Sequence, residues 1–445
     1  MTMKFMTGAT EKEVLDISAL LAGDYEGKDV KINGAIHKIR DMGDVAFIVL
    51  RKREGLVQTV YEEGVTNISL KDLCEEATVE VMGTVAKEER APQGFEIRLK
   101  EVKILSKPTE PMPIAVNKWK MSTSLETKLD LRPLSLRNIK ERAKFRIQEG
   151  IVRGFRDYLH QQGFTEIHSP KIGARGAEGG ANLFRLEYFH KHAVLAQSPQ
   201  FYKQMMVGVF DRVFEAAPVF RAEKHNTKRH LNEYTSLDFE MGYIDSFEDI
   251  MEMETGFLQY TMKLLETEYG KELQILGVTL PKVDQIPQVR FDEAKELVAE
   301  KYNRKIRNPY DLEPEEEALI GQYFKEEMDA DFVFVTHYPS KKRPFYAMDD
   351  PEDSTFTLSF DLLFHGLEIT TGGQRIHEYQ MLMDKIADRG MTDEGMEQYM
   401  MIFKHGMPPH GGLGIGLERL TMKILGEENV RETTLFPRDL SRLEP

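Results

Sequence analysis

Five short strand-like segments, separated by turn residues, fill the chain from about residue 29 to residue 106. Each is rich in the apolar, β-branched and aromatic residues that favour an extended backbone. Strands of this length at this spacing are typical of a small closed barrel. The five segments span residues 30–32, 45–50, 56–61, 78–82 and 95–99. We therefore predict an N-terminal β-barrel domain over residues 1–107.

A proline-punctuated stretch follows the barrel, with Pro108, Pro111 and Pro113 close together. Proline fixes its own φ and lacks an N–H, so such a stretch is extended and ends any preceding strand. It marks a domain boundary. We place a linker at residues 108–138 and a second domain at residues 139–445.

The second domain opens with a helical pattern. Apolar residues recur at helical spacing over residues 139–162, and Gly163 stops the pattern. Residues 165–170 then form a predicted strand that ends in Pro170. Residues from about 247 to 331 are mostly helical and acidic, and we interpret them as a helical insertion between strands. The chain as a whole is predicted to be α+β.

The composition of the chain restricts the cellular compartment and the binding partners that we expect. A chain of 445 residues with a single cysteine, Cys74, cannot close an internal disulfide or build a cysteine zinc cluster. No apolar run reaches membrane-spanning length, and the first residues lack the apolar core of a secretory signal. We expect a cytoplasmic protein with no membrane partner. The net charge of −15 disfavours nucleic acid on average, but basic clusters such as residues 38–40 leave a local binding face possible.

Cations surround an acid in the segment from residue 220 to residue 230. A planar guanidinium such as Arg221 suits phosphate oxygens, and His225 and His230 can donate hydrogen bonds to a polyphosphate. Glu223 can hold an amino group. The pattern favours a nucleoside triphosphate site, and the alternative is a solvated hairpin with ordinary surface charge.

A second cluster lies near the C-terminus, where glycines at alternate positions run into a helix-like segment that carries Arg419. The glycines are Gly412, Gly414 and Gly416. A strand without side chains lets a ligand approach the backbone closely. Arg419 can then lie over a purine or reach the γ-phosphate.

These two clusters together resemble motifs 2 and 3 of the class II aminoacyl-tRNA synthetases. The helix over residues 139–162 and the strand that ends at Pro170 resemble motif 1, which builds the dimer interface in that family. The resemblance covers nearly the whole chain. It implies that the barrel is an OB-fold, that the second domain is a class II catalytic domain with an antiparallel sheet flanked by helices, and that the protein is a homodimer.

Two further segments, residues 195–204 and 367–377, are similar to the aspartyl-tRNA synthetase subgroup in its compact archaeal and eukaryotic form. The resemblance implies that Lys203 and Arg375 bind the side-chain carboxylate of L-aspartate. A fixed fork and a nearby point charge suit a dianionic amino acid and penalise a neutral amide. Glu178, Gln200 and Thr371 match the remaining positions of the aspartate site.

The same resemblance implies that ATP is a substrate and Mg²⁺ a cofactor. Asp361 and Glu368 match acids that bind magnesium, which prefers oxygen ligands, although either acid alone could instead form a salt bridge. Tyr234 stands where the family usually has a phenylalanine that stacks on adenine, and a tyrosine can still stack. The matching catalytic positions are Arg221, Glu223 and Arg419, and the ATP-binding positions are these three with His225, His230, Tyr234, Glu368 and Gly416.

In the barrel, Arg40, Phe47 and Gln58 match positions that contact the anticodon in this family. An open barrel face suits unstacked bases, although a phenylalanine in a strand is more often a core residue. Relatives often carry a tryptophan after Gly34, where this chain has Ala35, in a region that helps distinguish the third anticodon base. We therefore expect tRNA(Asp) as a partner and hypothesise that tRNA(Asn) is charged as well.

Three alternatives stay open. An asparaginyl-tRNA synthetase shares the fold, but Lys203 and the segment Thr235-Ser236-Leu237-Asp238 disfavour it. A paralogue that binds tRNA or a nucleotide without aminoacylation is disfavoured by the intact set Arg221, Glu223, Asp361, Glu368 and Arg375. A tRNA-independent amidating ligase would have no evident use for the barrel.

Overall fold

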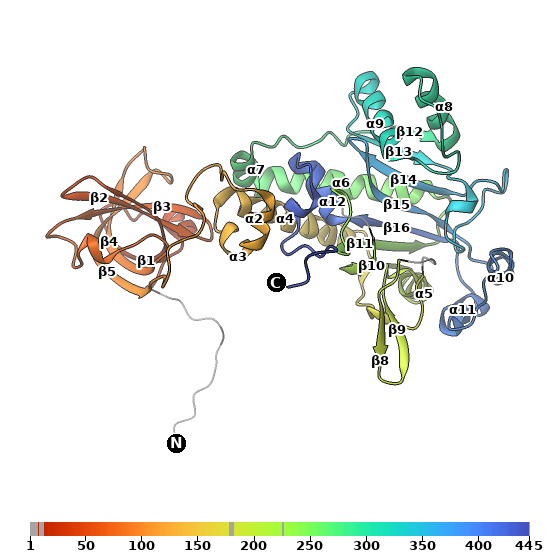
Figure 1. Ribbon diagram of the computed structural model, residues 1–445, viewed down its shortest axis with the longest axis horizontal. Coiled ribbons are helices and arrows are strands. Elements are labelled where there is room, and N and C mark those ends of the chain that lie inside the picture. Colours follow the sequence, from red (N-terminus) through yellow and green to blue (C-terminus); the bar gives the residue numbers. More distant parts are fainter. Residues whose placement is uncertain (1–7, 9–12, 178–181, 225–226, 445) are drawn as a thin grey trace. The chain divides into compact units, whose positions relative to one another are not determined.

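The computed structural model describes residue 8 and residues 13–177, 182–224 and 227–444 (Figure 1). The chain divides into two compact units, Met1–Ile139 and Lys140–Pro445. Each unit has its own hydrophobic core.

The first unit is a closed barrel with the strand order β1-β2-β3-β5-β4. All neighbouring strands are antiparallel except β3 and β5, which are parallel. The strands are β1 (Asp29–Asp41), β2 (Val45–Lys52), β3 (Gly55–Glu62), β4 (Thr78–Lys87) and β5 (Phe95–Ser106). The five predicted strands and the OB-fold barrel are confirmed. Short helices α1 (Ile17–Ala22), η1 (Leu70–Asp72), α2 (Leu125–Asp130) and α3 (Arg132–Ser135) complete this unit.

The faces of the barrel strands follow their alternation. On β2, Ala46, Ile48 and Leu50 are fully buried and belong to the barrel core, whereas Phe47 is only half-buried. Successive side chains of a strand point to opposite faces. Phe47 therefore lies on the outer face of the barrel and not in its core.

The second unit contains an eight-stranded sheet in the order β12-β13-β14-β15-β16-β11-β10-β6. In the run β13-β14-β15-β16-β11-β10, each strand is antiparallel to the next. The two edge strands are parallel to the strand beside them, β12 to β13 and β6 to β10. The expected antiparallel sheet is thus its centre. The strands are β6 (Thr165–Glu166), β10 (Arg212–Phe220), β11 (Glu233–Gly242), β12 (Gln288–Arg290), β13 (Phe332–Thr336), β14 (Ser359–Phe364), β15 (Leu367–Arg375) and β16 (His410–Gly416). A small separate sheet holds β7 (Ile172–Gly173), β8 (Arg185–Tyr188) and β9 (Lys191–Leu195).

The helices of this unit include the predicted long helix, which is α4 and is followed by Gly163 with a φ of 79°. The described helices are α4 (Ile139–Gln161), α5 (Gln200–Phe210), α6 (Glu248–Glu268), α7 (Gly270–Leu276), α8 (Phe291–Tyr302), α9 (Pro314–Met328), α10 (Tyr379–Asp388), α11 (Glu397–Lys404) and α12 (Leu417–Leu425), with 3-10 turns η2 (Ser340–Lys342) and η3 (Val430–Thr433). Within the described ranges, no helix is long and apolar enough to cross a bilayer.

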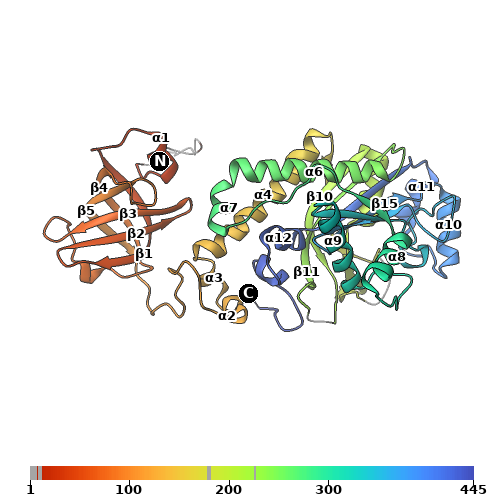
Figure 2. The same cartoon turned by 90° about the horizontal axis from the view of Figure 1, so that it is seen from above.

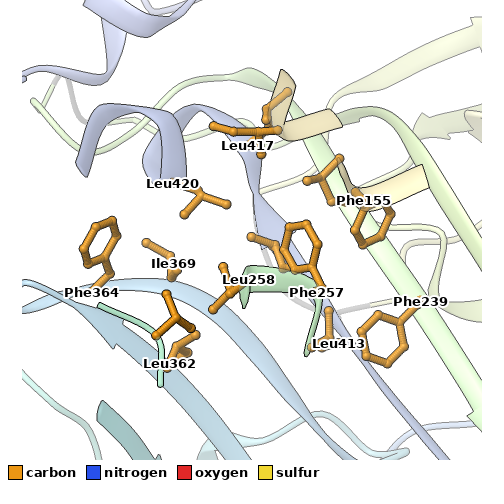
Figure 3. Close-up of a cluster of buried hydrophobic side chains, with 14 of the residues drawn as sticks. Phe155, Phe239, Phe257, Leu258, Leu362, Phe364, Ile369, Leu413, Leu417 and Leu420 are labelled. Carbon is orange, nitrogen blue, oxygen red and sulfur yellow. The ribbon is translucent and has the colours of Figure 1, made fainter. Parts of the chain in front are cut away.

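The main core lies between the sheet and the helices α4, α6 and α12. Figure 3 shows Phe155 of α4, Phe257 of α6 and Leu420 of α12 meeting side chains from the sheet. α4 and α6 run together along the unit (Figure 2) because a glycine removes the bulk between them. A Cβ on Gly154 would lie 2.4 Å from Oγ1 of Thr261.

The predicted insertion is built into this core. α6 supplies core residues, and β12 forms an edge strand of the large sheet. α8 and α9 pack on β13 and β14 through a separate apolar cluster that includes Val298, Ile320, Val335 and Leu363. Residues 247–331 therefore do not form a module apart from the sheet.

Candidate active site

A cleft of about 650 Å³ lies on the sheet face opposite the main core. Along β11, Leu237 and Phe239 point into the core, whereas Ser236 and Asp238 line the cleft. This follows from strand alternation. The predicted site residues that line it are Gln200, Lys203, Arg221, Glu223, His230, Tyr234, Glu368, Thr371, Arg375, Gly416 and Arg419. Glu178 and His225 lie outside the described residues.

Four buried charges form the floor at one end of the cleft. Nζ of Lys203 lies 2.9 Å from Oδ1 of Asp238 and 3.3 Å from Oε2 of Glu240. Nε of Arg375 donates to Oε1 of Glu240 at 2.8 Å. Lys203 and Arg375 also donate to the carbonyls of β16, at Leu413 and Gly412. Two cations and two carboxylates thus hold each other in one fixed arrangement.

Electrostatics favour the ionised form of the Glu240 carboxylate. Burial alone would raise the pKa of Glu240, but the charges of Arg375 and Lys203 outweigh it and hold this pKa below its ordinary value. Gly412 makes room for the arrangement, since a Cβ there would lie 2.1 Å from Oε2 of Glu240. The glycine pattern therefore serves two purposes: Gly412 accommodates Glu240, whereas Gly414 and Gly416 line the cleft.

A chain of neutral hydrogen bonds lies behind Gln200. Nε2 of Gln200 donates to Oε1 of Gln204 at 2.9 Å, and the hydroxyl of Tyr399 donates to the same oxygen at 3.0 Å. The ring of His410 contacts the carbonyl of Pro408 through Nδ1 and the amide of Gln204 through Nε2, each at 2.9 Å. Burial lowers the pKa of His410 to about 4, so Nδ1–H donates to Pro408 and Nε2 accepts from Gln204. The orientation of Gln200 depends on this chain.

The opposite end of the cleft gathers the residues predicted to bind a nucleotide. The guanidinium of Arg221 lies 5.8 Å from the ring centroid of Tyr234. The carboxylate of Glu223 accepts a hydrogen bond from Asn182 at 3.3 Å. Nη1 of Arg419 donates to the carbonyl of Glu368 at 3.1 Å. A ring, two guanidiniums and carboxylates thus meet at this end of the cleft.

His230 stands at the same end, with Nδ1 2.6 Å from the hydroxyl of Thr227. Burial and the charge of Arg419 lower the pKa of His230 below its ordinary value. A neutral ring can still donate one hydrogen bond.

The two acids predicted to bind magnesium differ in their surroundings. Asp361 does not line the cleft and pairs with Nη2 of Arg343 at 2.7 Å. Burial and the charge of Glu368 raise the pKa of Asp361 to about 6, against the effect of Arg343. For Glu368, burial is outweighed by Arg419 and Arg221, which lower its pKa.

The two acids stand on neighbouring strands: Asp361 of β14 pairs across the ladder with Thr371 of β15, whose hydroxyl donates to Glu368 at 3.2 Å. Magnesium is commonly held by one or two carboxylates together with substrate phosphates, so Asp361 and Glu368 fit such an ion. The described part of the chain contains no cluster of three or more His, Cys, Asp or Glu side chains suited to a metal.

On the barrel, the three predicted anticodon positions share the outer face. Arg40 pairs across the strands with Phe47, and Gln58 pairs with Val49, two residues along from Phe47. A hollow of about 250 Å³ is lined by Arg40, Gln58, His37, Lys38 and Trp119 among others. Phe47 is not part of its lining.

Comparison with known families agrees with both units. Residues 124–440 match the tRNA synthetases class II (D, K and N), and residues 30–105 match the OB-fold nucleic acid binding domain. The chain belongs to the class II tRNA synthetases.

Individual relatives of this class II synthetase match nearly end to end. The aspartate–tRNA(Asp/Asn) ligase of Deinococcus radiodurans is 48% identical over 427 residues, which cover 95% of this chain and 97% of that protein. The aspartate–tRNA(Asp) ligase of Pyrococcus furiosus is 40% identical over 428 residues, again 95% and 97%. A solved asparaginyl-tRNA synthetase of Pyrococcus horikoshii, complexed with asparaginyl-adenylate, superposes with a TM-score of 0.86 at 31% identity, covering 95% and 97%.

Glu240 and Arg343 are among the charged residues of this synthetase site that the sequence analysis missed. Glu240 could have been found, because Ser236, Asp238 and Glu240 alternate with apolar residues on one strand and so form one polar face. Arg343 gave no such signal among neighbouring surface cations. In the folded chain it lies 3.9 Å from the ring centroid of Tyr338 and pairs with Asp361.

Proposed function

We propose that this class II synthetase activates L-aspartate with ATP and transfers it to tRNA(Asp). The observation that carries the proposal is the pair Lys203 and Arg375, buried at one end of the cleft and held by two carboxylates. An ammonium and a guanidinium are donors only. Both oxygens of an aspartate carboxylate accept hydrogen bonds, whereas an asparagine amide would direct N–H groups at these donors.

The chemistry needs no general base in its first step. An oxygen of the aspartate α-carboxylate attacks the α-phosphorus of ATP, the bond to the β-phosphate oxygen breaks, and aspartyl-adenylate and diphosphate form. Arg221 stabilises charge on the α-phosphate, and His230 and Arg419 do so near the leaving group. Tyr234 stacks on adenine, and Gln200, with Glu178, holds the α-amino group.

Mg²⁺ is part of the proposal. Asp361 and Glu368 would hold it, and its charge would neutralise the phosphates of ATP. In the second step a hydroxyl of the 3′-terminal adenosine attacks the acyl carbon, and the ester forms with release of AMP and a proton.

The proposed organisation has three parts: residues 1–107 bind the anticodon, residues 108–138 link, and residues 139–445 carry the chemistry. We propose further that the protein is a cytoplasmic homodimer. Both tRNA(Asp) and tRNA(Asn) are proposed substrates, since Ala35 follows Gly34 and the relative at 48% identity is named for both tRNAs.

The first test is ATP–diphosphate exchange without tRNA, with aspartate and asparagine supplied separately. Exchange with aspartate alone is expected. Exchange with asparagine at a comparable rate would overturn the argument from Lys203 and Arg375, and no exchange with either amino acid would favour a paralogue that does not aminoacylate.

The second test is aminoacylation of tRNA(Asp) and tRNA(Asn) transcripts at equal concentration. We expect aspartate on both. Product on tRNA(Asp) alone would contradict dual charging and leave the aspartate assignment intact.

A further inference from the structure

Helix α9 contacts the turn between β14 and β15 backbone to backbone. A Cβ on Gly321 would lie 2.4 Å from the backbone nitrogen of Gly366, and a Cβ on Gly366 would lie 2.6 Å from Cα of Ala318. Gly366 also has a φ of 68°, which suits glycine. Neither position accepts a side chain without a backbone shift. The helix and the turn therefore have one closely defined register.

Glu317 lies one helical turn before Gly321, and its buried carboxylate reaches the nucleotide end of the cleft. Oε2 accepts from Nη2 of Arg229 at 2.5 Å and from the backbone N–H of Glu368 at 3.2 Å. One carboxylate oxygen thus joins the segment that follows β10 to the beginning of β15.

Two further hydrogen bonds close a ring. Nε of Arg419 donates to the carbonyl of Arg229 at 3.2 Å, and Nη1 of Arg419 donates to the carbonyl of Glu368 at 3.1 Å. The ring connects α9, the segment before β11, α12 and β15. Three of its four residues line the cleft, and Glu317 does not.

Arg229 has a hydrogen-bond donor that this ring does not use. Its Nε is buried and has no hydrogen-bond partner among the residues that the structure describes. Its side chain lines the cleft beside His230 and Arg419. The lysine and arginine at the aspartate end, Lys203 and Arg375, take no part in the ring.

Stability alone is a weak explanation for such a contact. Desolvation of a buried ion pair offsets most of its attraction, and apolar replacements are often at least as stable. The contacts of Glu317 instead fix the positions of the Arg229 side chain and of the Glu368 backbone.

We propose that Glu317 is a positioning residue for the nucleotide: it acts through Arg229 and the backbone of Glu368 and does not touch the substrate. The inference rests on the proposed function, because it takes the occupant of this end of the cleft to be ATP. It assigns a role in the active site to the acidic helical segment in which the sequence revealed no chemistry.

The test compares Glu317→Gln with Glu315→Gln in ATP–diphosphate exchange. Glu315 belongs to the same helix, but its side chain is 69% exposed and pairs with Arg304 away from the cleft. Gln at 317 keeps the size of the side chain and replaces the carboxyl group, whose pKa burial raises to about 7, with a neutral amide. We expect the KM for ATP to rise by about tenfold or more in Glu317→Gln, with the KM for aspartate within about twofold, as for other residues that orient a ligand-binding group.

Glu315→Gln should leave both KM values unchanged. If Glu317→Gln does not fold, Glu317→Asp retains the carboxyl group, withdraws it by one methylene and should raise the KM for ATP in the same direction. An unchanged KM for ATP in the folded variant, or equal increases for ATP and aspartate, would overturn the inference. A wild-type protein without exchange would instead overturn the proposed function.

Discussion

Lys203 and Arg375 share Glu240 between them, so neither cation can be considered alone. Removal of Arg375 takes the two-point partner from the fully buried carboxylate of Glu240 and removes a donor from the proposed aspartate site. Both effects are large because a charge buried in a site of low polarity is poorly solvated and depends on its partners.

We predict that Arg375→Ala lowers kcat/KM for aspartate in the exchange reaction by more than about 100-fold. Glu240, left with Lys203 as its one remaining cation of the pair, should also lower the folding stability by up to about 3–5 kcal/mol, so activity is measured at a temperature where the variant is folded. Arg375→Lys, which keeps the charge and loses the fork, is the matched control and should retain more activity. A rate within about tenfold of wild type, roughly 1.4 kcal/mol, would refute the role of Arg375.

His410 provides a pH-dependent contribution to stability. Its pKa is about 4 in the folded chain, against an ordinary value of 6.5, because burial disfavours the charged ring. Below pH 6.5 the unfolded chain therefore binds a proton that the folded chain does not. The contribution is intact above pH 6.5 and is lost as the pH falls toward 4.

At about pH 5 the expected loss is about 2 kcal/mol relative to about pH 7.5. Urea unfolding of wild type and His410→Gln at both pH values measures it, since glutamine stays neutral and can still bond to Gln204 or Pro408. The stability difference between the two proteins should shift by that amount in favour of the variant at the lower pH. Identical pH dependence would show that His410 does not carry the effect.

At the scale of elements, close backbone contacts set the position of α9. In Gly321→Ala the new methyl group would meet the backbone of Gly366, so α9 or the β14–β15 turn must move. We predict a loss of about 1–3 kcal/mol in the free energy of unfolding and a higher KM for ATP, since Glu317 moves with the helix.

Gly270→Ala in α7 is the control, because a Cβ there meets nothing within 4 Å. It should be neutral or stabilise by up to about 1 kcal/mol. Thermal unfolding and exchange kinetics of Gly321→Ala and Gly270→Ala test this prediction. Equal stability of the two variants would mean that the contact between α9 and the β14–β15 turn is looser than described.

At the scale of the whole molecule, two units with separate cores suggest two separable tasks. Arg40 lies on the outer face of the barrel with Phe47, whereas the charged cleft belongs to the second unit. We predict that Arg40→Ala raises the KM for tRNA by about tenfold and leaves tRNA-independent exchange with aspartate unchanged.

Arg53→Ala serves as control, because this side chain is 81% exposed in the turn between β2 and β3 and does not line the hollow. It should affect neither reaction. Loss of exchange in Arg40→Ala would mean that the units do not act separately in this way.

Local pattern determined much of this protein. Alternation and turn residues specify the barrel strands, and helical spacing with Gly163 delimits α4. The segments around Arg221 and Arg419 predict a phosphate site from the sequence alone. These features depend on residues that are close together in the chain, so they can be predicted from the sequence alone.

Tertiary structure alone decided the partners of each charge. Glu240 meets Arg375, and Glu317 meets Arg229, across 135 and 88 positions of the chain. The two-residue strand β6 and the edge strand β12 likewise exist through their neighbours in the sheet. A buried charge requires a partner at a distance of a few ångström, and only the packing of the sheet with its helices determines which residue that partner is.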